Sequence, residues 1–369
     1  MKLMKTTEAV GQVLCHDITQ IIPGVKKDAV FRKGHIITKE DIPVLLSVGK
    51  DTIYIWENDD TMMHENEAAQ VLYHMCVCGT NSNETDTKRH CDAAESGDSD
   101  STVSKMHPSS VKEGKIEVIA DCDGLLKVDS EKLKKVNSFG EMMIATRHGN
   151  TTVKKDDKLA GTRIIPLVIK KDKLEAASHI CDDGPILDIK PFVIRKAAII
   201  TTGNEVYHGR IQDAFTPVIE KKIAEFGAQM MFHEVFDDDD KKITDGCLRA
   251  IEAGAEIVFC TGGMSVDPDD KTPLAIKNTG ARIVSYGSPV LPGAMFLLSY
   301  YDAGDRLVPI CGLPGCAMYN KRTIFDIVLP RLMARDMILA DELAGLGEGG
   351  LCLNCDVCTF PNCGFGKGF

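Results

Sequence analysis

The strongest constraint on the fold is a regular alternation of apolar runs and amphipathic segments that begins at residue 196. The runs KAAIITTG, AQMMFHEVF and AEIVFCTGG have the composition of buried strands, and DAFTPVIEKKIAEFG and DDKKITDGCLRAIEAG between them have helical spacing. Because the connections are short, successive strands should lie parallel in one sheet, with helices over both faces. The pattern continues through RLVPICGLPG and AMYNKRTIFDIVLPRLMARD. We therefore predict an α/β fold, with a three-layer, doubly wound, mostly parallel sheet over residues 196–338.

The sequence before residue 196 predicts a discontinuous β-rich N-terminal domain made of residues 1–78 and 111–195. Strand-like runs such as DTIYIWE and GTRIIPLVIK recur there between turn residues. Residues 79–110 are polar, poor in aliphatic side chains and without period. Such a segment buries too little apolar surface to offset the entropy of ordering, so we predict a mobile insertion. Residues 339–369 are predicted to form a cysteine-rich, metal-binding tail.

Charge and cysteine content exclude several classes of protein. The 369-residue chain has 54 acidic and 43 basic residues and a net charge of -11. This balance argues against a nucleic-acid or anionic-membrane partner, because such a partner needs a basic surface. No window reaches the roughly 20 apolar residues of a membrane span, and the start lacks the apolar stretch of a secretory signal. We therefore expect a cytoplasmic protein whose 14 cysteines are thiols or metal ligands rather than disulfides.

Three glycine-marked loops follow the predicted strands: TTGNEV at 201–206, TGGMSVDPDD at 261–270 and GLPGCA at 312–317. Ligands of open α/β sheets bind outside the carboxyl ends of the strands. Glycine lets the backbone approach a ligand closely, and each loop leads into a predicted helix whose first amides attract anions. The three loops therefore predict one anion pocket. The alternative is that the glycines serve only to turn the chain.

The acids of the second loop have two interpretations. Asp267, Asp269 and Asp270, joined by Glu205, are suited to Mg²⁺ bound beside a phosphate, which takes one or two carboxylates from a protein. Acids at the start of a helix also stabilise its first turn without any metal. We assign that helix-capping role to Asp267 and Asp269. Asp270, next to Lys271, is the functional candidate.

The motifs TTGNEV, GRIQD, TGGMSVDPDD, LPGAMF and GLPG together resemble the molybdopterin-binding domain of MoeA/gephyrin-type molybdenum insertases and related adenylyltransferases. The resemblance implies a pocket for molybdopterin, or its adenylated form, held through the terminal phosphate of the pterin. In insertases the adenylated form is cleaved while molybdate is added in the presence of Mg²⁺. Family members often pair through this domain, which implies a homodimer.

Carried onto this chain, the resemblance implies catalytic roles for Asp270 and Lys271. The cofactor-binding positions that it implies are Thr202, Gly203, Asn204, Glu205, Asp213, Thr261, Gly262, Gly263, Met264, Ser265, Asp269, Pro292, Gly293, Gly312, Leu313, Pro314 and Gly315.

The chain departs from the insertase pattern at three places. It has Leu291-Pro292-Gly293-Ala294-Met295 where insertases have Lys-Pro-Gly-Lys-Pro, Cys316-Ala317 where they have Asn-Pro, and no N-terminal Asp-Asn-Ser-Ala-Met-Asp-Gly segment. Loss of two cations weakens electrostatic stabilisation of a transition state. Two hypotheses follow for a protein that binds molybdopterin or its nucleotide derivative in cofactor biosynthesis or maturation. One is an enzyme with Mg²⁺-assisted phosphoanhydride chemistry, and the other is a non-catalytic carrier or redox sensor that delivers the cofactor to a client molybdoenzyme.

The end of the sequence contains four cysteines, Cys352, Cys355, Cys358 and Cys363, spaced C-x2-C-x2-C-x4-C. Two-residue gaps let neighbouring thiolates converge, and the spacing is close to that of bacterial ferredoxins. Zinc also accepts four thiolates. The tail therefore predicts an iron-sulfur cluster or Zn²⁺, with a plain reduced tail as the alternative.

Overall fold

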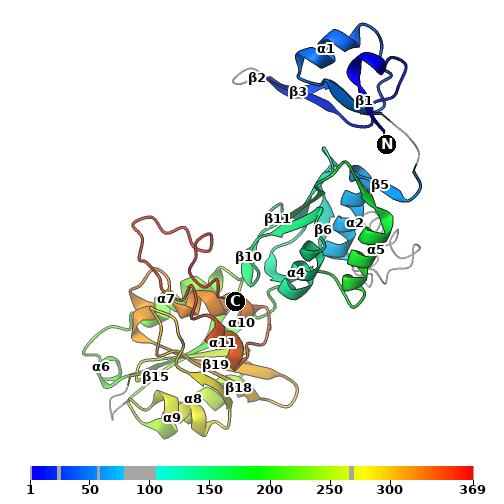
Figure 1. Ribbon diagram of the computed structural model, residues 1–369. Helices are drawn as coiled ribbons and strands as arrows, with labels where there is room; N and C mark the ends of the chain where they lie inside the picture. Colours follow the sequence, from blue (N-terminus) through cyan, green and yellow to red (C-terminus); the bar gives the residue numbers. More distant parts are fainter. Residues whose placement is uncertain (1, 23–25, 56–58, 79–104, 266–269, 369) are drawn as a thin grey trace. The chain divides into compact units, whose positions relative to one another are not determined.

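The computed structural model describes residues 2–22, 26–55, 59–78, 105–265 and 270–368 (Figure 1). The chain divides into two compact units. The first contains Met1–Cys122, Val128–Arg147 and Lys155–Asp188, and the second contains Asp123–Lys127, His148–Lys154 and Ile189–Phe369. Among the described residues, no helix is both long enough and apolar enough to cross a membrane.

The first unit contains several small antiparallel sheets. The largest has four strands in the order β6-β7-β11-β9, and α2 packs on β7 and β11. Strand β7 alternates between buried and more exposed side chains, which is why it presents a single apolar face to that helix. The elements of this unit are β1 (Lys2–Lys5), η1 (Thr6–Glu8), β2 (Ile18–Ile22), β3 (Lys26–Phe31), α1 (Asp41–Ser47), β4 (Thr52–Ile55), β5 (Met62–His64), α2 (Glu65–Val77), β6 (Met106–Pro108), β7 (Lys115–Ala120), α4 (Ser130–Ser138), β9 (Met142–Thr146), β11 (Lys158–Ile164), β12 (Val168–Lys170), α5 (Lys171–Ser178) and η3 (His179–Cys181).

One boundary of the predicted mobile insertion is wrong. Residues 79–104 lie outside the described part of the chain, but Met106–Pro108 forms the strand β6, which pairs antiparallel with β7. Met106 is buried in this unit. Its apolar side chain gives the end of the polar segment a packing partner that composition alone does not reveal.

The second unit is built on a six-stranded sheet of order β15-β14-β16-β19-β18-β17. The first four strands are parallel, and β18 and β17 add an antiparallel edge. The elements of this unit are β8 (Gly124–Val128), β10 (Thr151–Val153), β14 (Lys196–Thr202), α6 (Asn204–Tyr207), α7 (Phe215–Ala224), β15 (Gln229–Phe236), α8 (Asp240–Glu252), β16 (Ile257–Thr261), α9 (Thr272–Asn278), β17 (Arg282–Tyr286), β18 (Leu297–Asp302), β19 (Leu307–Leu313), η4 (Gly315–Met318), α10 (Ile324–Met333) and α11 (Ala340–Gly345), with β13 (Leu187–Lys190) at the boundary between the units.

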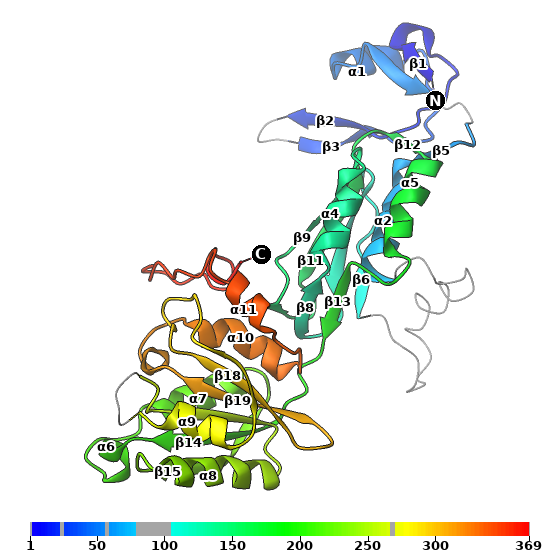
Figure 2. The same ribbon diagram turned by 60° about the horizontal axis from the view of Figure 1, so that its bottom comes forward.

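Helices cover both faces of this sheet (Figures 1 and 2). Alternate residues of β14 enter different cores: Ile199 packs in the cluster that includes α7 and α10, and Ile200 packs in the cluster that includes α8. In the first cluster the rings of Phe259 and Phe325 meet edge to face, with centroids 5.3 Å apart. Two separate apolar layers are what a doubly wound sheet requires. The predicted α/β class, with its β-rich N-terminal portion, is therefore confirmed.

Candidate functional site

The register of the parallel strands places the three glycine loops at one edge of the sheet. Thr201 at the end of β14 lies opposite Thr261 of β16, and Thr261 lies opposite Leu313 of β19. Strand β18 runs the other way and begins at the same edge, because Leu297 lies opposite Gly312. The loop over residues 287–296 therefore joins the other three. We call this set of loop starts the strand-end edge.

Two of these loops are locked together by close backbone contact. Gly262 has φ +83°, and a Cβ atom there would lie 2.1 Å from the Thr202 carbonyl oxygen. The Thr272 hydroxyl donates to the Gly262 carbonyl at 2.9 Å and lies 3.0 Å from Thr202 Oγ1. Gly263, with φ +53°, would place its Cβ 2.8 Å from Thr272 Oγ1. Both glycines are thus required by close approach of backbone and hydroxyl groups, whether or not a ligand binds.

The helices after these loops are short. α6 has 4 residues, α9 has 7, and the GLPG loop leads into the 3-10 turn η4. A helix dipole grows with aligned peptide units, so these turns supply little of the predicted attraction for anions. Hydrogen-bond donors in the loops themselves would have to attract an anion.

Thr261 has a side chain with an unusual environment. It is fully buried, and its Oγ1 finds no hydrogen-bond partner among the residues that the structure describes. A buried hydroxyl without a partner costs about 1–3 kcal/mol. The atom lies at the end of the central strand β16, so it is a candidate for contact with a ligand at the strand-end edge.

Asp213 is held in place by the protein itself. Its carboxylate accepts hydrogen bonds from Thr201 Oγ1 at 3.0 Å, Thr216 Oγ1 at 2.5 Å and the backbone amide of Phe215 at 2.8 Å. Burial acts to raise the pKa of Asp213, but the hydrogen bonds from Thr216, Phe215 and Thr201 outweigh it, and the pKa is lowered. Asp213 therefore fixes the start of α7. Its predicted contact with a cofactor stays a prediction.

The first loop is tied to the end of β15. Gly203, with φ +129°, donates its amide to the Phe236 carbonyl at 3.2 Å, and the Asn204 amide donates to Asp238 Oδ2 at 3.2 Å. Asn204 and Glu205 have exposed side chains. This loop thus presents an amide and a carboxylate to solvent from a fixed backbone.

The second loop divides into packing and exposed positions. Met264 is buried, and its sulfur occupies the space that a side chain at Gly312 would need. Ser265 is exposed, while Asp267 and Asp269 lie outside the described residues. Met264 is thus a packing residue in this structure, and the Ser265 hydroxyl faces solvent.

Asp270 and Lys271 lead into α9. Burial, and then the negative charge of Asp270, raise the pKa of Tyr286, the last residue of β17. The Tyr286 hydroxyl donates to the Met264 carbonyl at 3.3 Å. This hydrogen bond ties the second loop to the end of β17.

The remaining predicted positions shape the edge near β18 and β19. The Pro292 carbonyl accepts from the Ile324 amide at 3.1 Å, and a Cβ at Gly293 would lie 2.4 Å from Ile324 Cγ2. Leu313 and Pro314 are buried, whereas Gly315 is exposed. These residues fix the loops against α10, with Gly315 exposed and Pro292 half-buried.

A comparison with protein-family models identifies the kind of domain that carries the strand-end edge. Residues 198–334 match the family described as a probable molybdopterin binding domain. These residues belong to the molybdopterin-binding domain family. The predicted resemblance to a molybdopterin-binding domain is confirmed for this part of the chain, and the MoeA/gephyrin type stays a prediction. A second family model, described as a domain of unknown function, matches residues 3–57.

Curated relatives match shorter stretches. A protein of Bacillus velezensis, named as competence-damage inducible, is 29% identical over 90 residues, which are 24% of this chain and 21% of the relative. A protein of Bacillus cereus with the same name is 32% identical over 129 residues, 35% of this chain and 30% of the relative. One of Clostridium kluyveri is 26% identical over 156 residues, 37% of each chain. The chain thus spans at most 37% of the length of these three relatives.

Two solved structures are similar to part of this chain. The tungsten cofactor synthesizing protein MoaB from Pyrococcus furiosus is 18% identical, with a TM-score of 0.30, covering 40% of this chain and 91% of that chain. The protein CinA with unknown function from Thermoplasma acidophilum is 19% identical, with a TM-score of 0.28, covering 34% and 92%.

The cysteine tail packs on the molybdopterin-binding domain. The Leu291 amide donates to the Gly350 carbonyl, and the Cys352 amide donates to the Leu291 carbonyl, each at 2.8 Å. Lys321 Nζ donates to the carbonyls of Cys355 and Asp356 at 3.5 Å and 3.2 Å. The tail thus contacts the 287–296 loop and the segment after the GLPG loop, both of which start at the strand-end edge.

The four tail cysteines share one cavity but are not gathered at one point. Cys352, Cys355, Cys358 and Cys363 line a cavity of about 230 Å³. In the part of the chain that the structure describes, no three His, Cys, Asp or Glu side chains are placed to hold one metal ion. The predicted iron-sulfur cluster or Zn²⁺ at the tail stays a prediction. The backbone amide of Phe360, and then Arg322, lower the pKa of the Cys358 thiol.

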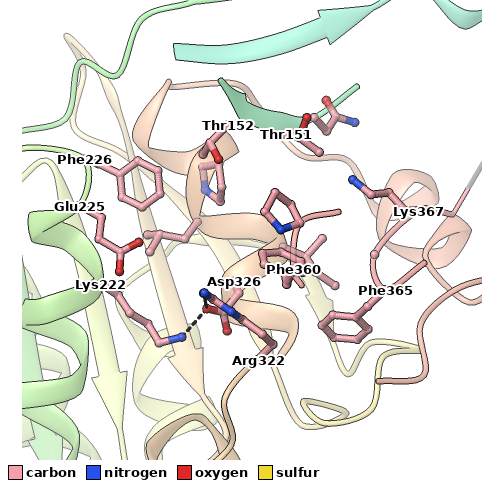
Figure 3. A pocket seen from close by; sticks show the side chains of 16 residues that line it. Thr151, Thr152, Lys222, Glu225, Phe226, Arg322, Asp326, Phe360, Phe365 and Lys367 are labelled. Atoms are coloured by element: carbon pink, nitrogen blue, oxygen red, sulfur yellow. Dashed lines mark hydrogen bonds and ion pairs between the residues drawn. The ribbon is translucent and has the colours of Figure 1, made fainter. Parts of the chain in front are cut away.

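A second cavity beside the tail contains charged residues that the sequence did not indicate. It has a volume of about 120 Å³, and Figure 3 shows Lys222, Arg322 and Asp326 at its wall beside Phe360 and Phe365. Asp326 forms ion pairs with Lys222 and, at 2.9 Å, with Arg322. The negative charge of Asp326 thus partly neutralises the positive charges of Lys222 and Arg322. The i,i+4 spacing of Arg322 and Asp326 was visible in the sequence, but Lys222, which is 104 residues from Asp326, was not.

Proposed function

We propose that this domain binds molybdopterin, or its nucleotide derivative, at the strand-end edge, in the biosynthesis or maturation of the molybdenum cofactor. The observation that carries the proposal is a coincidence of two findings. The family match covers residues 198–334, and within that range the ends of β14, β16 and β19 stand side by side. In open α/β sheets this is where ligands bind.

Donors for the terminal phosphate come from the second loop. Gly262 and Gly263 have no side chains to shield their backbone, and Ser265 offers an exposed hydroxyl. The buried Thr261 hydroxyl adds a donor that finds no partner among the described residues. In a chain of net charge -11, such local donors are needed to hold an anion.

The first loop is suited to the pterin ring. A pterin carries N–H donors and ring acceptors along one edge, and a carboxylate and an amide complement such an edge. Glu205 and Asn204 supply these groups from exposed positions on a loop whose backbone is fixed to β15. In this assignment the second loop binds the terminal phosphate of the ligand, and the first loop binds its pterin ring.

Two versions of the function follow. In the enzymatic version Asp270 helps to hold Mg²⁺, which would neutralise phosphate charge, and Lys271 assists phosphoanhydride cleavage. In the carrier version the domain holds the cofactor for a client molybdoenzyme. The sequence Leu291–Met295 carries no cation, and its first residue is hydrogen-bonded to the tail, which favours the carrier. A homodimer stays a prediction from the resemblance.

The test is equilibrium binding of molybdopterin and of its adenylated form to the anaerobically purified chain. We expect one ligand per chain, with Ser265→Ala weakening binding about tenfold, the effect of one lost hydrogen bond to a charged group. Ser110→Ala, at an exposed serine of the first unit, is the control and should leave affinity unchanged. Absence of binding to the wild-type chain would refute the proposal.

AMP release distinguishes the two versions. With adenylated molybdopterin and Mg²⁺, the enzymatic version predicts release of AMP that Asp270→Ala abolishes while binding persists. The carrier version predicts tight binding without AMP.

A further inference from the structure

We propose that Cys352, Cys355, Cys358 and Cys363 ligate an iron-sulfur cluster in the cavity that they line. This inference is independent of pterin binding. The four residues occupy one short stretch, and all four border the same cavity of about 230 Å³. Packing alone does not account for them, because Cys355 and Cys358 are exposed.

The room inside the cavity favours a cluster over a single ion. Zinc bonds thiolate at about 2.3 Å, so four sulfurs around it must lie roughly 3.8 Å apart. A cluster is larger than an ion and binds its thiolates around a central volume. Four cysteines at the wall of one cavity provide such a volume.

The backbone that carries the cysteines is fixed at both ends. The Cys352 amide bonds to Leu291, and the Gly366 amide donates to the Gly349 carbonyl at 3.0 Å. Gly349 has φ +76°, and a Cβ there would lie 2.7 Å from the Gly364 carbonyl oxygen. The segment therefore forms a closed loop whose ends touch. A closed loop holds four ligands at less entropic cost than a free tail.

The walls of the cavity suit an anionic, water-shielded group. Phe360 and Phe365 supply apolar surface, and Lys321 and Arg322 supply positive charge. The Arg322 guanidinium lies 5.0 Å from the centre of the Phe360 ring. Four thiolates give an iron-sulfur centre a net negative charge, which nearby cations offset. The hydrogen bond between Cys352 and Leu291 ties this segment to the 287–296 loop, so the cluster would lie beside the strand-end edge.

The experiment is anaerobic reconstitution of the full chain with ferrous iron and sulfide. We expect iron and acid-labile sulfide in equal amounts and a broad visible absorption near the blue end of the spectrum. Cys355→Ser and Cys358→Ser should each lose most of this absorption, and thermal unfolding of the unloaded protein should not change, because both side chains are exposed. Cys122→Ser, in the first unit, is the control and should load like the wild type.

Three results would overturn the proposal. The first is a wild-type chain that acquires no stoichiometric iron and sulfide. The second is one tightly bound zinc per chain that excludes iron, and the third is full loading of both tail variants. Pterin affinity measured on the unloaded Cys355→Ser variant reports separately on the proposed function, because this variant leaves the strand-end edge unchanged.

Discussion

The strand-end edge and the cysteine tail are held in place by different forces. At the edge, strands fix the loops in register, and Gly262 brings the backbone against the Thr202 carbonyl. Among its described residues, the tail contains no helix or regular strand after residue 345. It is fixed by hydrogen bonds at Leu291 and by the cations Lys321 and Arg322. Close packing tolerates no added atom, whereas polar anchoring depends on charge. The two regions should therefore fail under different substitutions.

The largest effect is expected at Asp326, which anchors the tail side. Asp326→Asn removes the charge that pairs with Lys222 and Arg322 at a buried position. Removing one partner of a buried ion pair costs about 3 kcal/mol. Urea unfolding should show this loss, and hydrogen exchange should speed up over residues 351–366 because Arg322 is released.

Asp305→Asn is the matched control for this prediction. Asp305 pairs with Arg306, but 71% of its side chain is exposed. A surface pair of this kind should change the free energy of unfolding by less than about 0.5 kcal/mol. Equal losses in the two variants would contradict the importance of the Asp326 anchor.

The edge is tested by Gly262→Ala. The added Cβ meets the Thr202 carbonyl oxygen at 2.1 Å, so the backbone of two strand ends must shift. We expect a loss of about 2 kcal/mol in the free energy of unfolding. Gly280→Ala is the control, since Gly280 has a similar φ of +85° but nothing within 4 Å of the Cβ position. It should show only the strain of a positive φ, about 1 kcal/mol; an equal loss would mean that the edge is not closely packed.

Acid should weaken the edge through Asp213. Its folded-state pKa is lowered, so its contribution is present above the pKa of the unfolded chain and is lost as pH falls through the folded value. The pH dependence has the same sign at Asp336. Burial acts to raise the pKa of Asp336, but the ion pairs with Lys127 and Lys190 outweigh it and lower the pKa to about 2. Unfolding measured from pH 5 to pH 2 should show falling stability. In the Asp213→Asn variant, the free energy of unfolding should fall less steeply as the pH falls. An unchanged pH dependence would contradict the stabilising role of the hydrogen-bonded Asp213 carboxylate.

The mostly parallel sheet and the common edge of the loops were predictable, because hydrophobic runs joined by short helical links permit few topologies. The local roles of the loop residues were not. Met264 and Ser265 are neighbours in the same glycine-marked loop, yet Met264 packs against Gly312 and Ser265 is exposed. Which way a loop side chain points depends on tertiary contacts.

The cysteine tail shows a second limit of prediction from sequence. Cysteine spacing identified the residues, but the partners of the tail are distant in sequence: Leu291 with Cys352, and Lys321 with Asp356. No local pattern encodes such pairs. The ion pair between Lys222 and Asp326 was missed for the same reason.

The smallest effect on stability, and the most direct test of the central claim, is expected from Thr261→Val. Valine has nearly the shape of threonine but lacks the hydroxyl, whose oxygen has no partner among the described residues. The free energy of unfolding without ligand should stay the same or rise by up to about 1 kcal/mol. The affinity for molybdopterin, measured by calorimetry on both proteins, should fall about tenfold if this hydroxyl contacts the ligand. Unchanged affinity in the variant would contradict the proposal that the ligand binds at the end of β16.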